Sequence, residues 1–328
     1  MLGNNILITG GAGYVGAVLI PTLLEMGHRI TCLDLMLYGE NVLPAHDRLR
    51  VVQGDIRNEK LLRDIMFGQD IVVHLACISN DPSFELNPAL GKSINLDAFR
   101  PLVEISLEYG VERFIYASSS SVYGIKEEPD VHEDIDLEPL TDYSKFKAEC
   151  EDILLKYNSS KFTTVTLRPA TVCGYSPRQR LDVVVNILTN IAFHKREITV
   201  FGGEQLRPNI HIADMVDAYK AVIGAPKDKV SGKKFNVGYE NQSVRQLANI
   251  VRSVVGEDVK LITTPTDDNR SYHISSKRIE EDLGFVAGNT IKGAVLDLCD
   301  ALRTGKLPNS LEDEKYFNIK RMKSVDLS

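Results

Sequence analysis

A glycine-rich turn near the start of the sequence constrains the fold of this chain more than any other feature. It reads Gly10-Gly11-Ala12-Gly13-Tyr14-Val15-Gly16 and follows the short apolar run 5–9. The next stretch, 14–26, has helical periodicity and stops at Gly27, a residue type common at helix ends. Glycines at this spacing between a strand and a helix let the backbone approach a pyrophosphate closely, although a turn that only needs positive φ is the alternative. The predicted phosphate-binding residues are Gly10, Gly13, Tyr14, Val15 and Gly16.

Short apolar runs recur after this turn, with helix-like segments between most of them. They span 29–34, 49–53, 70–75, 114–118 and 163–168. Such alternation of strands and helices produces a parallel sheet with helices on both faces. The sequence therefore predicts an α/β fold built on a Rossmann-type doubly wound parallel sheet, with a smaller C-terminal substrate-binding domain.

The pattern of the sequence changes near residue 172, because prolines and glycines often break the chain after this point. We expect residues 1–171 to form the dinucleotide-binding domain and residues 172–328 mainly the substrate-binding domain. The apolar run 234–237 resembles another sheet strand and is expected to return to the first domain. The charged stretch after Pro308 is expected to pack loosely.

Composition excludes several classes of protein. A formal net charge of −7 argues against a nucleic-acid partner, which requires clustered basic residues. No signal-like start and no apolar run of about 18 residues is present, so we expect a cytoplasmic protein that does not span a membrane. Five widely separated cysteines are expected to be free thiols and not a disulfide framework or a metal site.

Two carboxylates follow the second and third predicted strands. Asp34 ends the second strand, where it can accept hydrogen bonds from the ribose hydroxyls of an adenosine and would repel a 2′-phosphate. This position predicts NAD and not NADP as the cofactor. Asp55, followed by Ile56, is placed to meet the adenine, with a loop-capping role as an equal alternative.

A tyrosine and a lysine four residues apart, Tyr143 and Lys147, project from one face of a predicted helix. A nearby ammonium group favours the phenolate, which can remove a proton from a substrate alcohol. The serine run 118–121 follows a predicted strand, at the edge where such a sheet presents groups to a nicotinamide. On the residues alone, a polar turn is the better explanation for any one of these serines.

With these motifs in this order and spacing, nearly the whole chain resembles the extended short-chain dehydrogenase/reductase family of nucleotide-sugar epimerases and dehydratases. The resemblance implies that Ser119, Tyr143 and Lys147 are catalytic. It also implies that Lys147 holds the nicotinamide ribose and that Leu75, Ala76 and Asn95 lie at the cofactor. The family commonly forms homodimers through two long helices, here expected near 95–109 and around Tyr143.

The resemblance also suggests residues for a nucleoside-diphosphate sugar. Arg207 matches an arginine that family members use on the substrate diphosphate, and Arg270 resembles a second one. Further candidate substrate residues are Ser79, Asp81, Ser120, Ser121, Thr171 and Asn186.

One departure from the family narrows the chemistry. Sugar 4,6-dehydratases carry an Asp-Glu pair directly after the catalytic residue, where this chain has Ser120 and Ser121. Serines cannot transfer protons as carboxyl groups do near neutral pH, which disfavours dehydration. The resemblance therefore implies an NAD-dependent nucleoside-diphosphate-sugar epimerase that acts through a 4-keto-sugar. A 4-dehydrogenase similar to those acting on GDP-heptose is the alternative, because the run 168–186 resembles that subgroup, and a non-catalytic NAD-sensing protein is a remote one.

Overall fold

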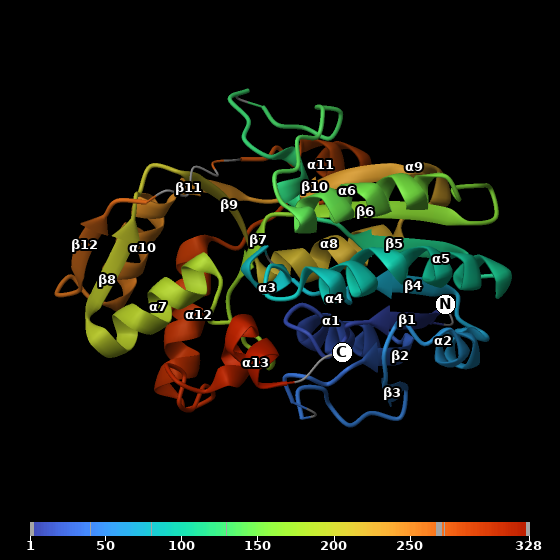
Figure 1. Ribbon diagram of the computed structural model, residues 1–328, viewed down its shortest axis with the longest axis horizontal. Helices are drawn as coiled ribbons and strands as arrows, with labels where there is room; N and C mark the ends of the chain where they lie inside the picture. The colour runs from blue at the N-terminus through green and yellow to red at the C-terminus, as the bar shows by residue number, and fades with distance from the viewer. Residues whose placement is uncertain are drawn as a thin grey trace.

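Seven parallel strands form the main sheet of the computed structural model, which describes residues 3–39, 41–79, 81–128, 130–266, 271 and 273–325 (Figure 1). Their order across the sheet is β10-β6-β5-β4-β1-β2-β3. The bounds are β1 (Asn5–Thr9), β2 (Arg29–Asp34), β3 (Leu49–Gln53), β4 (Ile71–His74), β5 (Arg113–Ala117), β6 (Thr163–Pro169) and β10 (Lys233–Val237). The order reverses beside β1, so a crevice opens at the carboxyl ends of the strands.

Helices cover both faces of this sheet, which confirms the predicted doubly wound fold. One face carries α1 (Gly16–Glu25) and α8 (Ile212–Gly224), which pack against each other. The other carries α2 (Glu59–Met66), α5 (Phe99–Glu108) and α6 (Asp142–Leu155). Short elements join the main ones: α3 (Asp81–Phe84), α4 (Pro88–Lys92), the π-helical turn η1 (Ser93–Asp97), the 3-10 turn η2 (Ser120–Tyr123), α9 (Lys227–Val230) and α11 (Lys277–Leu283).

Alternation along the strands divides the core into two layers. Ile6 and Ile8 of β1 face the layer that contains α1 and α8, while Leu7 faces the layer that contains α2 and α5. All three side chains are fully buried. A strand that is buried on both faces reads as a continuous apolar run, which is why β1 was visible in the sequence.

The second half of the chain builds a smaller lobe beside the sheet. It contains the three-stranded sheet β11-β9-β7 and the parallel pair β12-β8. Its strands are β7 (Thr171–Cys173), β8 (Glu197–Phe201), β9 (Leu206–His211), β11 (Glu240–Ser243) and β12 (Lys260–Thr264). Its main helices are α7 (Val184–Lys195), α10 (Val244–Val255) and α12 (Ile291–Arg303), which pack on one another around a separate apolar core. Because β10 pairs with β6, the chain returns from this lobe to the main sheet before it builds α10.

The segment after Pro308 packs closely, so the expectation of loose packing was wrong. It forms the 3-10 turn η3 (Glu314–Tyr316) and the helix α13 (Asn318–Ser324). Ser310, Tyr316 and Asn318 are buried. The many charged side chains of this segment made it look exposed in the sequence, although a few buried residues hold it against the rest of the protein.

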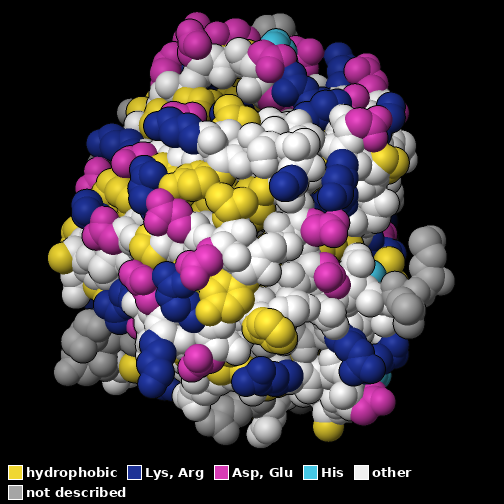
Figure 2. All heavy atoms as spheres, turned by 90° about the vertical axis from the view of Figure 1, so that its right-hand side faces the viewer, with side chains coloured by type: hydrophobic (Ala, Val, Ile, Leu, Met, Phe, Trp, Pro, Cys, Tyr) yellow, Lys and Arg dark blue, Asp and Glu magenta, His cyan; other side chains and the backbone are white. Residues whose placement is uncertain are grey.

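The surface mixes both signs of charge on the face that Figure 2 displays, with hydrophobic side chains gathered between the charged ones. In the described part of the chain, no helix combines the length and the apolar character needed to cross a bilayer. The five cysteines are free thiols, and all but Cys77 are buried.

Candidate active site

A cavity of about 370 Å³ lies along the carboxyl edge of the main sheet, between the sheet and the smaller lobe. This volume is within the range of small-molecule sites. Most of the predicted site residues line it: Gly10, Gly13, Tyr14, Val15, Gly16, Asp34, Asp55, Ile56, Leu75, Ala76, Ser79, Ser119, Ser120, Ser121, Tyr143, Lys147 and Thr171.

The glycine turn forms one wall of the cavity. Gly10 has φ +71°, and a Cβ there would lie 2.5 Å from the backbone nitrogen of Ala76. A Cβ on Gly16 would lie 2.3 Å from the carbonyl oxygen of Gly11. The turn therefore needs glycine at both positions for its conformation and its packing. Among the described residues no side chain caps the start of α1, and Tyr14, Val15 and Gly16 at this helix end line the cavity.

Asp34 closes the cavity at the end of β2. Its Oδ2 accepts a hydrogen bond from the Ala12 backbone N–H at 3.0 Å, and its Oδ1 accepts one from Met36 at 2.8 Å. A carboxylate has about four lone-pair sites, so acceptor capacity is left for ribose hydroxyls. Burial raises the pKa of Asp34, although these two N–H groups oppose the shift.

Asp55 is held by its own loop. Its carboxylate accepts the backbone N–H of Arg57 at 2.8 Å and the Arg57 guanidinium at 2.7–3.1 Å. Burial acts to raise the pKa of Asp55, but the Arg57 hydrogen bonds outweigh it and hold the pKa below its usual value. Asp55 thus caps its loop while it also lines the cavity.

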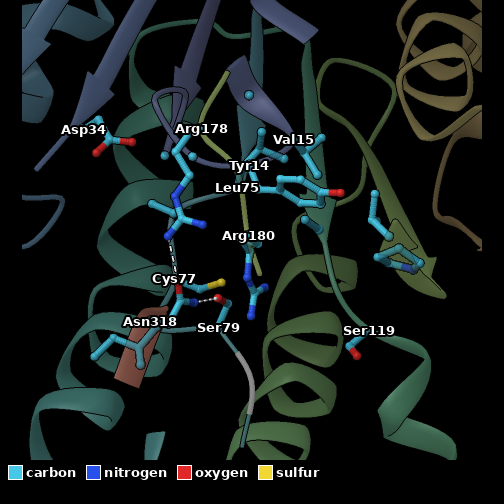
Figure 3. Close-up of a pocket in the computed structure, with 18 of the residues that line it drawn as sticks. Tyr14, Val15, Asp34, Leu75, Cys77, Ser79, Ser119, Arg178, Arg180 and Asn318 are labelled. Carbon is cyan, nitrogen blue, oxygen red and sulfur yellow. Dashed lines mark hydrogen bonds between the residues drawn. The ribbon is translucent and has the colours of Figure 1, made fainter. Parts of the chain in front are cut away.

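Ser119 lies at the opposite end of the cavity from Asp34, directly after β5 (Figure 3). Its Oγ lies 2.8 Å from the Oγ of Ser121 and accepts the Ser121 backbone N–H at 3.1 Å. The hydroxyl is therefore held in place by the start of η2. No carboxylate stands at positions 120 and 121.

Helix α6 presents Tyr143 and Lys147 to the same cavity. The helix begins at a capping box in which Thr141 and Ser144 bond to each other's backbone N–H groups, so its first turn is fixed. The Lys147 ammonium donates to the Ala117 carbonyl at 2.6 Å and lies 4.9 Å from the centre of the Tyr116 ring. It is 5.8 Å from the centre of the Tyr143 ring, close enough to act electrostatically on the phenol.

A buried ionic network supports this end of the cavity. Glu151 of α6 accepts hydrogen bonds from Arg168 of β6 at 2.6–3.2 Å and from the Ser118 hydroxyl at 2.5 Å. Arg168 also donates to the Tyr123 hydroxyl at 2.7 Å. Because the network joins α6, β6 and the serine run, it fixes the element that carries Ser119 relative to the helix that carries Tyr143.

Asn95 does not line the cavity. Its side-chain oxygen accepts the backbone N–H of Ile78 at 2.8 Å, and its nitrogen donates to the Ile78 carbonyl at 2.9 Å. Ile78 belongs to the cavity-lining loop 75–79 after β4. Asn95 therefore positions the loop that was predicted to face the cofactor.

Asn186 is fully buried and faces the glycine turn instead of the cavity. Its amide donates to the Tyr14 hydroxyl at 3.0 Å and to the Arg180 carbonyl at 2.8 Å, and it accepts the Gly174 N–H at 3.0 Å. The predicted contact of Asn186 with a nucleotide is corrected to a structural role, because these protein partners use its amide.

The two arginines predicted to bind the substrate diphosphate are not found among the described residues that line this cavity. Arg207 of β9 is half-buried, lies outside the cavity lining and donates to the Leu206 carbonyl at 2.9 Å. Arg270 lies outside the described residues, as does the side chain of Asp81 in α3.

Several cavity residues were not predicted. They are mainly polar or aromatic and come from the β2–β3 loop, the β7–α7 loop and α13: Tyr38, Arg178, Arg180, Asn318 and Met322. The two arginines lie in the run that supported the family resemblance, but no role was predicted for them. Their spacing within a proline-containing loop was the only available signal.

A parallel sheet with a glycine turn at its carboxyl edge, and with serine, tyrosine and lysine on one cavity, defines a nicotinamide-dependent enzyme of the short-chain dehydrogenase/reductase type. The chain belongs to the NAD-dependent epimerase/dehydratase family, whose model matches residues 6–238. This finding confirms the family predicted from the motifs.

Individual relatives of the chain are also nucleotide-sugar enzymes by their descriptions. The chain is 31% identical over 273 residues to the uncharacterized UDP-glucose epimerase YtcB of Bacillus subtilis, covering 78% of this chain and 84% of the relative. It is 28% identical to a dTDP-glucose 4,6-dehydratase of Streptomyces griseus, covering 91% and 92%. The solved structure of MoeE5 in complex with UDP-glucuronic acid and NAD is 27% identical, with a TM-score of 0.80 and coverage of 92% and 99%.

The residues around the cavity fit the NAD cofactor of this family. Gly10 and Gly13 leave the backbone of the turn open, and Asp34 offers acceptors for ribose hydroxyls. Arg178 and Arg180 also line the cavity; Arg180 is paired with Asp182, whereas Nε and Nη1 of Arg178 are buried with no hydrogen-bond partner within the described part of the chain. Unpaired cationic donors of this kind suit a dinucleotide that carries two phosphates.

Proposed function

We propose that this enzyme is an NAD-dependent nucleoside-diphosphate-sugar epimerase that acts through a 4-keto-sugar. The observation that carries the proposal is the single cavity that joins the glycine turn and Asp34 to Ser119, Tyr143 and Lys147. The relative that is 31% identical is described as an uncharacterized UDP-glucose epimerase, and this supports a nucleotide sugar as substrate.

The chemistry follows from the three polar groups at the far end of the cavity. Bound NAD supplies a hydride acceptor that becomes a hydride donor for the return step. Tyr143 removes the proton from the sugar O4 as the C4–H bond breaks, and it returns the proton when the ketone is reduced. Lys147, fixed by the Ala117 carbonyl, favours the phenolate form of Tyr143. Ser119 donates a hydrogen bond to the developing carbonyl oxygen.

The serines at positions 120 and 121 argue for epimerisation over dehydration. Loss of water from a 4-keto-sugar needs an acid for the leaving hydroxyl and a base for the C5 proton. The Ser121 hydroxyl is instead bonded to Ser119, and Ser120 is buried. A serine hydroxyl does not act as acid or base near neutral pH, so the keto-sugar keeps its oxygen until hydride returns.

The substrate would enter between the catalytic end of the cavity and the smaller lobe. We propose Ser79, Ser120, Ser121 and Thr171 as sugar or diphosphate contacts because all four line the cavity, with Arg207, Arg270 and Asp81 at the outer part of the substrate. These residues do not indicate which base the nucleotide of the substrate carries, because they form no recognisable base-binding pattern.

The deciding experiment follows both the sugar and the redox state. Purified enzyme with NAD is incubated with UDP-, GDP-, CDP- and dTDP-sugars, and products are identified by NMR while NADH absorbance is recorded. Formation of the C4 epimer with no net NADH would support the proposal. Accumulation of NADH and a ketone would replace it with the 4-dehydrogenase.

We also propose a cytoplasmic homodimer. Helices α5 and α6 pack side by side on one face of the sheet and supply the two long helices that the family uses for dimers. Five free thiols fit a reducing compartment. A monomeric mass by light scattering would contradict the dimer.

A further inference from the structure

Arg178 is a buried cation on the cavity wall that the proposed reaction does not use. It lies in the loop between β7 and α7, and 4% of its surface is exposed. Its Nη2 donates to the Asn318 side-chain oxygen at 2.6 Å, and its guanidinium lies 3.6 Å from the centre of the Tyr38 ring. Its Nε and Nη1 are buried with no hydrogen-bond partner among the described residues.

The charges around Arg178 leave it without a carboxylate partner. Neighbouring Arg180 donates to Asp182 at 2.9 Å. Asp182 and Asp34 act on Arg178 electrostatically without forming an ion pair with it. In the described part of the chain no acidic group lies within ion-pair distance of Arg178, whose contacts are an amide oxygen and an aromatic ring. Burial lowers the pKa of Arg178 to about 10. A buried, unpaired charge is destabilising, and an anion in the cavity would remove that penalty.

The position of Arg178 indicates which anion it meets. Figure 3 shows its side chain between Asp34 and Tyr14, at the glycine-turn end of the cavity and away from Ser119. Tyr38, on which the guanidinium stacks, follows Asp34 by four residues. We propose that Arg178 is a phosphate-binding residue for the pyrophosphate of NAD, donated across the cavity from the smaller lobe to complement the helix end of α1.

Asn318 of α13 is the positioning residue for this contact. Its side-chain nitrogen donates to the Ser79 hydroxyl at 2.8 Å while its oxygen holds Arg178, and its backbone N–H donates to Asp182 at 2.9 Å (Figure 3). Arg321, one turn further on, donates to the Leu37 carbonyl at 2.5 Å. Helix α13 thus joins the β2–β3 loop, the β4 loop and the arginine loop across the cofactor cavity.

Binding measurements on Arg178→Gln test the proposal with a readout that is independent of turnover. NAD, ADP and adenosine are titrated into full-length enzyme freed of nucleotide, alongside the wild type and the exposed charge control Arg303→Gln. NAD and ADP should bind about 10- to 100-fold more weakly to Arg178→Gln, because a charge-assisted hydrogen bond is lost, while adenosine affinity is unchanged. Unchanged ADP and NAD affinities would overturn the proposal.

The diphosphate of the sugar substrate is the other source of the same chemistry. UDP and GDP are therefore titrated into the same variants. The proposal expects equal affinities for them in wild type and Arg178→Gln. Weaker binding of UDP or GDP with unchanged ADP binding would assign Arg178 to the substrate and overturn the proposal.

Asn318→Asp gives a second test in which stability and affinity move in opposite directions. The new carboxylate would lie at the Arg178 guanidinium and neutralise it. Thermal unfolding of the nucleotide-free variant should then occur at the same or a higher temperature than wild type, while NAD affinity falls at least tenfold. Wild-type NAD affinity in this variant would overturn the proposal. Since the inference concerns cofactor binding, a negative epimerase assay would not affect it.

Discussion

Single side chains at the catalytic end are held by bonds that the substrate does not need to break. Lys147 is tied to the Ala117 carbonyl, and Ser119 is tied to Ser121 and to the start of η2. Preorganised groups of this kind lose little freedom during the reaction, which is how polar groups lower a barrier. The contribution of each of these side chains to the reaction rate can therefore be measured with a substitution that removes its polar group.

Tyr143→Phe removes the proposed proton acceptor and leaves the ring. We expect kcat to fall by about 10²- to 10⁴-fold, with nucleotide-sugar and NAD binding retained. Turnover is measured by NMR and binding by calorimetry. Tyr157→Phe is the matched control, because Tyr157 lies beyond the end of α6 and bonds to Glu104 outside the cavity. Near-normal turnover in Tyr143→Phe would remove this residue from the mechanism.

Motifs with fixed spacing predicted residue positions well, and isolated residues did not. Gly10, Asp34 and Tyr143 lie on the cavity as expected because each is defined by its place at a strand end or on a helix face. Arg178 in the β7–α7 loop and Asn186 in the first turn of α7 are both buried, yet Asn186 faces the protein interior and Arg178 lines the cavity. That difference depends on contacts with Tyr14 and Asn318, far away in sequence.

The strands of the main sheet could be predicted to within one residue, because most of their apolar runs are buried, although the edge strand β3 is largely exposed. The strand β10 pairs with β6 although about 60 residues separate them. By contrast, the small sheet β11-β9-β7 was not foreseen. Its strands are short, partly exposed and rich in polar residues, so only tertiary contacts define them.

The π-helical turn η1 provides a test at the level of one element, because it places Asn95 against the β4 loop. Asn95→Ala leaves the Ile78 N–H and carbonyl without these partners, so we expect the free energy of unfolding to fall by about 1–3 kcal/mol. NAD affinity should fall as well, since the loop lines the cavity. Urea unfolding and calorimetry measure the two effects.

Ser106→Ala is the control for Asn95→Ala, because the Ser106 hydroxyl is buried in α5 and, among the described residues, bonds within its own helix to Leu102. This control should lose stability without a change in NAD affinity. If Asn95→Ala also kept its NAD affinity, the positioning role of Asn95 would be contradicted.

For the whole molecule, stability is expected to depend on the protonation of His74. This histidine is buried at the end of β4, with its Nδ1 2.7 Å from the Thr9 hydroxyl, and burial, aided by the Lys147 charge, lowers its pKa to about 3. The unfolded chain binds a proton below about pH 6.5 and the folded chain does not until about pH 3. Stability from this group is therefore complete at neutral pH and decreases as the pH falls through that window.

Between pH 7 and pH 5 the loss attributable to His74 should be about 2 kcal/mol. The measurement is urea unfolding at both pH values for wild type and for His74→Asn, which keeps a group able to bond to Thr9. The variant should lose about 2 kcal/mol less than wild type over this range. Equal pH dependence in the two proteins would show that His74 titrates normally.

Helix α13 has a consequence for the way this protein is made and handled. The glycine turn and Asp34 emerge from the ribosome almost 300 residues before Asn318 and Arg321, which lie across the same cleft. The glycine turn is therefore synthesised long before the helix that completes the lining of the cavity. Because Asn318 and Met322 of α13 line the cavity, a bulky fusion placed near this helix should increase the rate at which the purified enzyme loses its nucleotide.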